Sequence, residues 1–334
     1  MYIQRTAESR LLGLLEGRKV VILLGARQVG KTTLVQRVLA DRKVVSLNFD
    51  IEIDKMRFLA AASLSPADAL QSLSNPEYLV VDEAQRLPET ARVVKGWYDA
   101  KLPVKILLLG SSSLELLNHA AESLTGRNEK LFLPPLLFDE VIRSRDWCPE
   151  TMPLSDIARH FQEPIHAGLL QSLAFGGYPE VVTTPDKPAL LRNLSSDYLW
   201  KDILQTGLVK SPDLIKRLLS LLAHQIGAEV SVHELATQLH MARQTVERYL
   251  DLLEQTWVIF RLPSYSTNPR KEIAKSRKIY FWDTGIRNAV LGTFSTVDLR
   301  GGCPKVFRNP GLSIEEVPDQ EEELVELSGS ENWP

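Results

Sequence analysis

The chain has 334 residues, which is enough for about two domains. Hydrophobic residues make up 44% and charged residues 24%, as in ordinary globular proteins, and a net charge of −3 gives no whole-chain sign of nucleic-acid binding. The two cysteines, Cys148 and Cys303, lie far apart, which argues against a disulfide scaffold or a zinc ribbon and fits a reducing compartment.

Neither the termini nor the histidines indicate a targeting segment or a metal site. No segment resembles a secretory signal or approaches the roughly 18 apolar residues of a membrane-spanning helix. We therefore expect a cytoplasmic protein without a membrane partner. The six histidines show no metal-ligand spacing, so no histidine metal centre is predicted.

A strand pattern and a helix pattern enclose a glycine-containing loop near the N-terminus. The apolar run Val20–Leu24 predicts a buried parallel strand, and the apolar spacing within Lys31–Leu39 predicts a helix. A plain strand-to-helix turn is the alternative to a phosphate loop, and this strand–loop–helix context disfavours it. The loop matches the P-loop pattern GxxxxGK(S/T), with the candidate nucleotide contacts Gly25, Ala26, Arg27, Gln28, Val29, Gly30, Lys31, Thr32 and Thr33.

Each part of this loop has a physical task in nucleotide binding. The glycines let backbone amides face phosphate oxygens, and the helix N-terminus adds a positive end. The Lys31 ammonium would reach the β and γ phosphates, and the Thr32 hydroxyl would ligate magnesium. The sequence therefore predicts ATP and Mg²⁺ as ligands.

A second buried strand, Tyr78–Val81, ends in two acids. P-loop ATPases hold magnesium with an acid at such a strand end, which assigns Asp82 to the metal site. Glu83 points across the strand end and is the candidate catalytic residue that polarises the attacking water. A surface acidic pair is the alternative, and it is the weaker one once a P-loop precedes it.

Serines follow the buried strand Ile106–Leu109. Ser111 or Ser112 could sense the γ-phosphate from between the two acids, and we take Ser112 as the catalytic candidate. A serine at this place could instead cap the helix that follows, because serine is a good N-cap residue.

Arg127 stands just before another strand, Lys130–Leu133. In oligomeric ATPases of the AAA+ type, an arginine at this place reaches a neighbour's γ-phosphate, where its guanidinium neutralises transition-state charge. Arg127 is therefore a candidate catalytic residue of a homo-oligomer. A structural ion pair with Asp139 or Glu140 is the alternative.

These strands, together with Val44–Phe49, alternate with helices. Such alternation predicts an α/β fold, a P-loop NTPase with a mainly parallel sheet and its site at the carboxyl ends of the strands. An all-helical segment and a winged helix-turn-helix domain are expected to follow. The predicted parts are an ATPase domain over 1–146, a helical linker or lid over 147–210, a winged-helix domain over 211–292 and a disordered acidic tail over 293–334.

The winged-helix expectation comes from three helical patterns and a strand pair. Ser211 and the following proline begin the first helix, Ser231 caps the second, and Arg243–Gln255 forms the third after a short turn. Val258–Tyr265 and Lys278–Trp282 predict a β-hairpin that would serve as the wing.

Candidate DNA contacts gather in the third helix and in the wing. Residues 270–278 carry five basic side chains, which can bind a phosphate backbone. The third helix also carries the acids Glu247, Asp251 and Glu254, and a helix of mixed charge is poorly suited to contact DNA bases. A winged helix that serves as a lid or as a protein-contact module is therefore the alternative. The candidates are Arg243, Gln244, Thr245, Arg248, Arg270, Lys271, Lys275, Arg277 and Lys278.

Two segments resist a functional interpretation. The run FGGYPEVV, Phe175–Val182, predicts a turn with unusual backbone angles, and no chemical role follows from it. After Gly292 the helical and strand periodicities stop. From Glu315 the chain holds eight acids and no lysine or arginine, which predicts disorder.

Taken together, the motifs resemble a family of prokaryotic AAA-like ATPases with a C-terminal winged-helix domain of unknown function. The likeness runs from about Met1 to Gly292 and rests on GARQVGKTTL, YLVVDEAQRLPE, LLLGSSSLELL, SLTGRNEKLFLPPLLFDE, FGGYPEVV, QTVERYLDLLEQTWVIFRLPSY and KIYFWDTGIRNAVLG. It implies an AAA+ type core with ATP and magnesium, and it supports the assignments of Asp82, Glu83 and Arg127. The family's LWENF-like segment and nuclease-like fold are not found after Gly292. We therefore expect no nuclease activity and interpret this end as a truncation or a shifted reading frame.

The function expected from these motifs is that of an ATP-binding and ATP-hydrolysing switch or motor protein whose winged helix contacts DNA. Two alternatives stay open. One is a DNA-binding regulator that uses ATP only as a ligand, and the other is a protein-partner module in a defence or toxin-regulation system.

Overall fold

A five-stranded parallel sheet forms the core of the N-terminal part, in a computed structural model that describes residues 2–111, 124–149, 151–198, 203, 211–262 and 277–294. The strands stand in the order β2-β3-β4-β1-β5, and every neighbouring pair is parallel. All five predicted strands are present, which confirms the expected P-loop NTPase class of fold. Their bounds are Val20–Leu24 for β1, Val44–Asn48 for β2, Tyr78–Asp82 for β3, Lys105–Gly110 for β4 and Asn128–Phe132 for β5.

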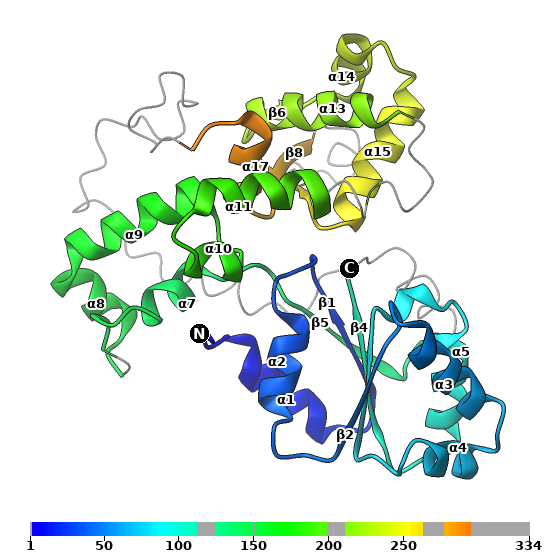
Figure 1. The fold of residues 1–334 in the computed structure, drawn as a ribbon. Coiled ribbons are helices and arrows are strands. Elements are labelled where there is room, and N and C mark those ends of the chain that lie inside the picture. The colour runs from blue at the N-terminus through cyan, green and yellow to red at the C-terminus, as the bar shows by residue number, and fades with distance from the viewer. Residues whose placement is uncertain are drawn as a thin grey trace, which may run out of the picture.

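Helices cover both faces of this sheet (Figure 1). On one face lie α1 (Ala7–Glu16) and α2 (Lys31–Val38), and on the other lie α3 (Glu52–Ala62), α4 (Pro66–Ser72) and α5 (Thr90–Asp99). Because neither face meets water, β1 is apolar throughout and β4 is apolar from Ile106 to Leu109, instead of alternating between apolar and polar residues.

Successive strand residues supply two separate hydrophobic cores. Ile22 packs with Phe58 and Trp97 on one side of the sheet, whereas Leu23 packs with Leu34 on the other side. Burying each such side chain contributes about 1.5–3 kcal/mol. The sheet is therefore a firm platform for the loops that leave its carboxyl edge.

A run of helices leads from the sheet to the C-terminal part. These helices are α7 (Phe138–Arg143), α8 (Leu154–His160), α9 (Gln162–Phe175), α10 (Pro179–Thr183) and α11 (Lys187–Asn193), with a π-helical turn at Leu194–Tyr198. Val181 of α10 and Leu191 of α11 are fully buried in the core of the C-terminal part. These two helices are therefore packed as part of it.

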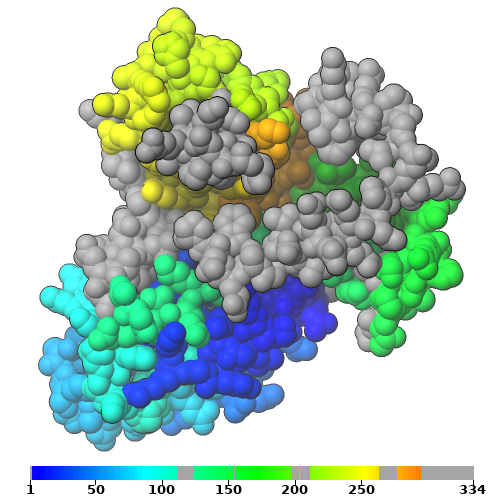
Figure 2. Space-filling view, turned by 180° about the vertical axis from the view of Figure 1, so that it is seen from behind, coloured from blue at the N-terminus to red at the C-terminus, as the bar shows by residue number. Residues whose placement is uncertain are grey.

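The C-terminal part combines helices with a small antiparallel sheet. In chain order it holds α13 (Pro212–His224), β6 (Glu229–Val230), α14 (Val232–Leu239), α15 (Arg243–Gln255), β7 (Ile259–Leu262), β8 (Arg277–Phe281) and α17 (Thr284–Leu291). The strand order is β6-β8-β7. The three predicted helices and the predicted strand pair are thus present. Seen from behind, this part forms a lobe above the parallel-sheet lobe (Figure 2).

The predicted acidic tail lies almost entirely outside the described residues, which end at residue 294. Among the helices that the structure describes, none is both long enough and apolar enough to cross a membrane.

A buried ion pair ties the N-terminal segment to the P-loop. Arg5 Nε lies 3.0 Å from Glu140 Oε2, and the two side chains are only 4% and 2% exposed. Arg5 also donates to the carbonyl oxygens of Val29 and Pro134, at 2.8 and 2.6 Å. Glu140 accepts from the Thr6 amide at 2.7 Å. The pair therefore holds the P-loop against the segment that follows β5.

Replacing Glu140 by alanine is expected to lower the free energy of unfolding by about 3–5 kcal/mol, because the buried Arg5 charge loses its partner. Asp139→Ala is the matched control. Asp139 is the preceding residue, and its ion pair with Arg143 is 34% and 36% exposed, so its loss should cost about 0–1 kcal/mol. Urea unfolding of the three proteins measures both values, and equal losses would contradict a dominant role for the buried pair.

Candidate nucleotide-binding site

The P-loop connects β1 to α2 at the carboxyl edge of the sheet. Gly30 has φ +93°, a left-handed conformation that side-chain-bearing residues rarely adopt, and it leads directly into α2. The Lys31 side chain is buried and its Nζ donates to the carbonyl oxygens of Gly25 and Ala26, both at 2.8 Å. The ammonium is thus held inside the loop, next to the backbone amides that would face phosphate.

The P-loop hydroxyl and the first strand-end acid meet directly. Thr32 Oγ1 donates to Asp82 Oδ2 at 2.6 Å, which joins the start of α2 to the end of β3. These are a hydroxyl and a carboxylate oxygen, and oxygen ligands are what Mg²⁺ prefers. The pair predicted as the metal site is therefore brought together, and its chemistry fits a magnesium ion shared with phosphate oxygens.

Glu83 is held by two neighbours in a defined position. Its Oε2 accepts hydrogen bonds from Ser111 Oγ at 3.0 Å and from Gln85 Nε2. Gln85 Nε2 also lies 3.2 Å from Ser111 Oγ, and both of these residues are buried. The serine at the end of β4 thus contacts the second acid at the end of β3. The candidate sensor that the structure places in the site is Ser111, while Ser112 lies outside the described residues.

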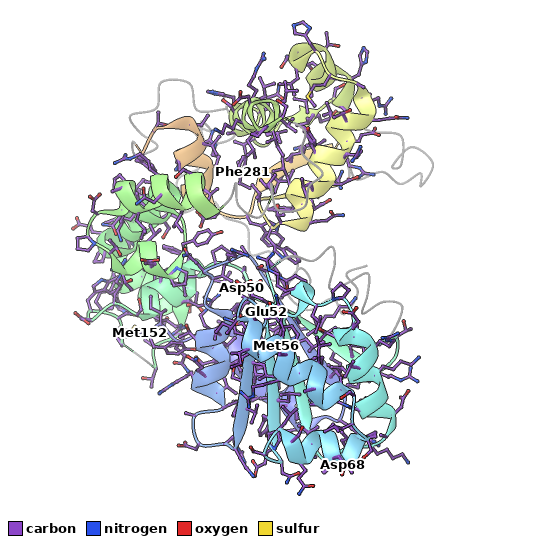
Figure 3. The ribbon with its side chains drawn as sticks, turned by 45° about the vertical axis from the view of Figure 1, so that its right-hand side comes forward. Asp50, Glu52, Met56, Asp68, Met152 and Phe281 are labelled. Carbon is purple, nitrogen blue, oxygen red and sulfur yellow. The ribbon has the colours of Figure 1, made fainter. Side chains whose placement is uncertain are left out.

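A cleft of about 380 Å³ opens beside these groups, which is within the range of small-molecule sites. Asp50, at the end of β2, borders it from the upper side of the parallel-sheet lobe (Figure 3) and forms an ion pair with Arg86 at 3.0 Å. Pro179 and Glu180 of α10 line it from outside the sheet. The cleft-lining residues are Arg27, Gln28, Gly30, Lys31, Thr32, Thr33, Asp50, Asp82, Glu83, Pro179 and Glu180.

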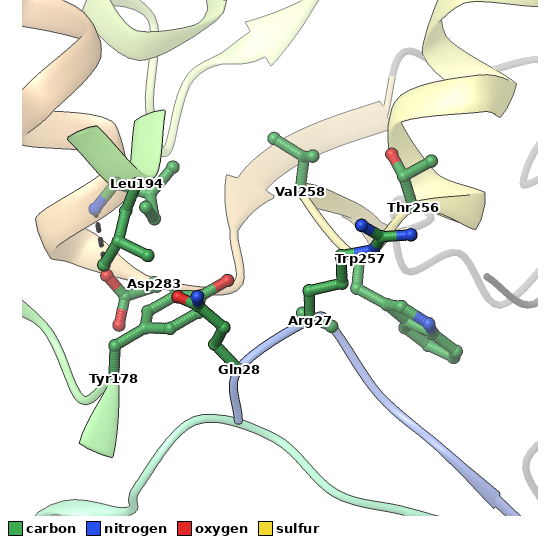
Figure 4. A pocket seen from close by; sticks show the side chains of 10 residues that line it. Arg27, Gln28, Tyr178, Leu194, Thr256, Trp257, Val258 and Asp283 are labelled. Atoms are coloured by element: carbon green, nitrogen blue, oxygen red, sulfur yellow. Dashed lines mark hydrogen bonds between the residues drawn. The ribbon is translucent and has the colours of Figure 1, made fainter. Parts of the chain in front are cut away.

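The tip of the P-loop contacts the C-terminal part. Arg27 and Gln28 reach toward Trp257, in the connection from α15 to β7, and toward Asp283 (Figure 4). Gln28 adopts φ 61°, so the loop turns sharply here. These two predicted contact residues therefore border both the cleft and the C-terminal part.

Arg127 lies at the opposite edge of the sheet. Its carbonyl accepts from the amide of Val20, the first residue of β1, whereas the P-loop follows the last one. Five strand residues span about 16 Å, so Arg127 is remote from the P-loop of its own chain. Its side chain pairs with Asp99 at 2.7 Å. The expected partners were wrong, because Asp139 pairs with Arg143 and Glu140 with Arg5.

The described DNA-contact candidates lie on the surface. Arg243, Gln244 and Arg248 of α15 are exposed and Thr245 is half-buried, while Arg277 and Lys278 at the start of β8 are exposed. Arg270, Lys271 and Lys275 lie outside the described residues. None of the candidates that the structure describes lies among the residues that line the nucleotide cleft.

Several residues of the site escaped the sequence prediction, among them Pro179 and Glu180 of the cleft lining. Gln85 stands two positions after Glu83, and its only signal was the DEAQ run. Asp50 follows the predicted strand Val44–Phe49, for which the sequence indicates no site residue. Arg5, from a segment with no recognisable motif, donates a hydrogen bond to the carbonyl oxygen of Val29 in the P-loop. Each acts through a tertiary contact, which local patterns do not encode.

Comparisons with known proteins agree with this geometry. Residues 17–142 match a family model described as an AAA domain, and residues 167–297 match one described as a domain of unknown function (DUF8612). A Walker-type ATPase of Pyrococcus abyssi has the same fold, with a TM-score of 0.58, 17% identity and coverage of 87% of this chain and 96% of that chain. Residues 17–142 are thus similar to AAA domains, and the chain has the fold of a P-loop NTPase.

Curated relatives extend the likeness along the chain. Uncharacterized proteins of Mycobacterium tuberculosis and Mycobacterium bovis are each 32% identical over 315 residues, which is 92% of this chain and 63% of the relative. An uncharacterized protein of Methanocaldococcus jannaschii is 24% identical over 285 residues, or 79% of this chain and 60% of the relative. The chain therefore spans less than two thirds of the length of these relatives.

Asp283, at the N-terminus of α17, is a buried carboxylate near the site. Burial raises its pKa from 3.8 to about 6, although hydrogen bonds from the amides of Gly177, Ile286 and Gly285 lower it. The folded protein therefore binds this proton more tightly than the unfolded chain. The stabilising contribution is complete below the unfolded pKa and is lost as the pH rises through about 6.

The free energy of unfolding of the wild type, measured relative to Asp283→Asn, is expected to fall by about 2–3 kcal/mol between roughly pH 4 and pH 7. The variant cannot titrate at this position, so the difference isolates one group. Urea unfolding of both proteins across this range measures it. A difference that stays constant with pH would contradict the raised pKa.

Proposed function

We propose that the protein binds ATP with magnesium and hydrolyses it in the cleft between the P-loop and the end of β3. The observation that carries the proposal is the 2.6 Å hydrogen bond between Thr32 and Asp82, with Glu83 fixed beside it by Ser111 and Gln85. A protein that only binds a nucleotide, without hydrolysing it, would need only the P-loop. The additional ordered acid supplies a group that can act on water.

The proposed roles follow from the positions of the side chains. Lys31 would exchange its contacts with the Gly25 and Ala26 carbonyls for phosphate oxygens. Thr32 and Asp82 would hold the magnesium ion, which when bound neutralises phosphate charge. Glu83 would orient the attacking water, and Ser111 would fix the Glu83 carboxylate in that task.

The nucleoside half has a candidate place next to the phosphate cleft. A second pocket, of about 230 Å³, shares Gly30, Thr33, Pro179 and Glu180 with the cleft. Its remaining lining is largely apolar or aromatic, from Tyr2, Ile3, Arg5, Val29, Leu136 and Thr183. An apolar slot that continues from a phosphate site suits a purine ring.

Glu83→Gln is expected to reduce ATP turnover by about 100-fold or more, a barrier increase of a few kcal/mol, because the amide orients water poorly and accepts no proton. ATP binding should stay within about threefold, since Lys31, Thr32 and Asp82 are unchanged. Phosphate release and the Kd of a fluorescent ATP analogue measure the two effects.

Glu89→Gln is the matched control for this variant, because Glu89 is an exposed acid that makes no capping hydrogen bond at the start of α5. It should leave both values unchanged. Turnover that survives Glu83→Gln would contradict the role of this residue, and loss of binding in Lys31→Ala would still support a nucleotide site.

A second proposal concerns the C-terminal part, which we interpret as a winged helix that contacts DNA. The element order α13, β6, α14, α15, β7, β8 supports the interpretation. A further observation favours DNA contact. Two of the acids that seemed to oppose it are partly neutralised, because Arg261 pairs with Asp251 and Glu254.

The double variant Arg243→Ala/Arg248→Ala is expected to weaken duplex DNA binding and to lower the slope of log Kd against log salt by about 2, one for each lost phosphate contact. The double variant Arg57→Ala/Arg159→Ala removes two exposed charges elsewhere and should change neither. Fluorescence anisotropy at several salt concentrations measures the slope. Equal behaviour of the two variants would favour a protein-contact module.

We also propose an ATPase domain over 1–146, a helical segment over 147–210 and a winged-helix domain over 211–292, with α10 and α11 of the helical segment packed into the core of the C-terminal part. A homo-oligomer, in which Arg127 would serve a neighbouring subunit, completes the proposal. Since Arg127 is remote from its own P-loop, any catalytic role it has requires a second copy.

A further inference from the structure

The turn Gly176–Glu180 is the one wall of the nucleotide cleft that comes from outside the parallel sheet and its loops, among the residues that the structure describes. Pro179 and Glu180 line both the phosphate cleft and the adjoining apolar pocket. They begin α10, immediately after Gly176, Gly177 and Tyr178. The position of this turn therefore sets the width of the cleft on that side.

The turn is clamped between two parts of the molecule. On one side, the Leu136 amide donates to the Gly177 carbonyl at 2.7 Å. On the other side, the Gly177 amide donates to Asp283 Oδ2 at 2.7 Å. A Cβ atom at Gly177 would lie 2.2 Å from the Leu136 carbonyl oxygen, and one at Gly176 would lie 2.1 Å from Asp283 Oδ1. No side chain fits at either position.

Asp283 is itself fixed by the C-terminal part. Its Oδ1 accepts from the Ile286 amide at 2.9 Å and so caps α17. The helix α17 is hydrogen-bonded to the end of α9, through Thr284 Oγ1 to Ser172 O at 2.8 Å and through Asn288 Nδ2 to Ala174 O at 2.8 Å. The carboxylate therefore has little freedom, and the turn follows its position.

The tip of the P-loop borders the same small cavity as this carboxylate. Arg27, Gln28, Tyr178, Trp257 and Asp283 border one small cavity of about 30 Å³ (Figure 4). Asp283 thus stands where the P-loop tip, the cleft-lining turn and the C-terminal part come together.

We propose that Asp283 is a positioning residue for the nucleotide. It holds the turn Gly176–Glu180 in place as a wall of the cleft, so a side chain of the C-terminal part sets the affinity of the P-loop domain for ATP. The inference rests on the proposed function of nucleotide binding. It adds that this binding depends on a residue outside the AAA-type domain.

The test uses the full chain and a fluorescent ATP analogue with magnesium. Asp283→Asn places an amide NH₂ where a backbone N–H group now donates, and the turn loses a charge-assisted hydrogen bond. The Kd and the KM for ATP are expected to rise about tenfold, while kcat at saturating ATP stays within about twofold, because Lys31, Asp82 and Glu83 are untouched.

Asp186→Asn is the matched control. Asp186 also caps a helix, α11, by accepting from the Ala189 amide at 3.2 Å, but it is exposed and lies outside the cleft lining. A residue that only stabilises the fold would lower the unfolding midpoint and leave Kd unchanged. The Asp186→Asn variant is expected to behave in that way, and Asp283→Asn is expected to change Kd as well.

Pro179→Ala tests the same wall if Asp283→Asn fails to fold, since it loosens the turn from the cleft side without touching Asp283. A Kd raised by about threefold or more would support the proposal. If the wild type binds the analogue and the folded variant, Asp283→Asn or Pro179→Ala, binds it with an unchanged Kd, the positioning role is overturned and the proposed function stands. A wild type that does not bind the analogue overturns the proposed function and this inference together.

Discussion

The parallel alignment of β1, β3 and β4 is the constraint on which the site depends. Because the three strands run in the same direction, their carboxyl ends meet at one edge of the sheet, with Leu24 of β1 opposite Gly110 of β4. The P-loop, the acids and Ser111 follow these ends. β4 lies between the other two strands, so Ser111 stands where it can reach Glu83, and the bond from Thr32 to Asp82 spans the remaining gap. A shift of one residue in any strand would exchange its buried faces and take its loop out of this arrangement.

The C-terminal part is joined to this edge by packing as well as by polar contacts. Phe132, the last residue of β5, lies with its ring centroid 4.4 Å from that of Trp257 and 4.6 Å from that of Trp282. Such aromatic contacts add about 0.5–1.5 kcal/mol each beyond the area that they bury. Trp282 immediately precedes Asp283, so the aromatic cluster anchors the segment that carries the carboxylate of the turn. The nucleotide cleft is therefore assembled from both parts of the chain.

The sequence predicted the P-loop and the two acids because each depends on a local pattern, a buried strand followed by a loop or by a charged pair. It also predicted the strand pair of the C-terminal part. The contacts that support these groups could not be predicted in the same way. Arg5 reaches Val29 and Glu140 from a segment with no motif, and Gln85 acquires its role only because β4 brings Ser111 beside it.

The wrong partners for Arg127 have a simple geometric cause. Asp139 and Glu140 are close to Arg127 in the sequence, but β5 lies between them and carries the chain from one edge of the sheet to the other. Asp99, at the end of α5, is distant in sequence and close in space. The turn Gly176–Glu180 likewise could be predicted only in part. Its glycines are evident in the sequence, but the groups that exclude a side chain there are the Leu136 carbonyl and the Asp283 carboxylate, which are distant in the sequence.

Thermodynamic linkage gives the contact between the two parts a consequence in both directions. If Asp283 sets how tightly the cleft holds a nucleotide, then the nucleotide must stabilise the arrangement of the C-terminal part by the same free energy. A ligand of the C-terminal part that shifts α17 would change ATP affinity, and ATP would change the affinity for that ligand by an equal factor. This reciprocity does not depend on whether the ligand is DNA or a protein. It requires only that the ligand bind with different affinity to two arrangements that differ in the position of Asp283. The turn Gly176–Glu180, which is hydrogen-bonded to Asp283, would then change the shape of the cleft.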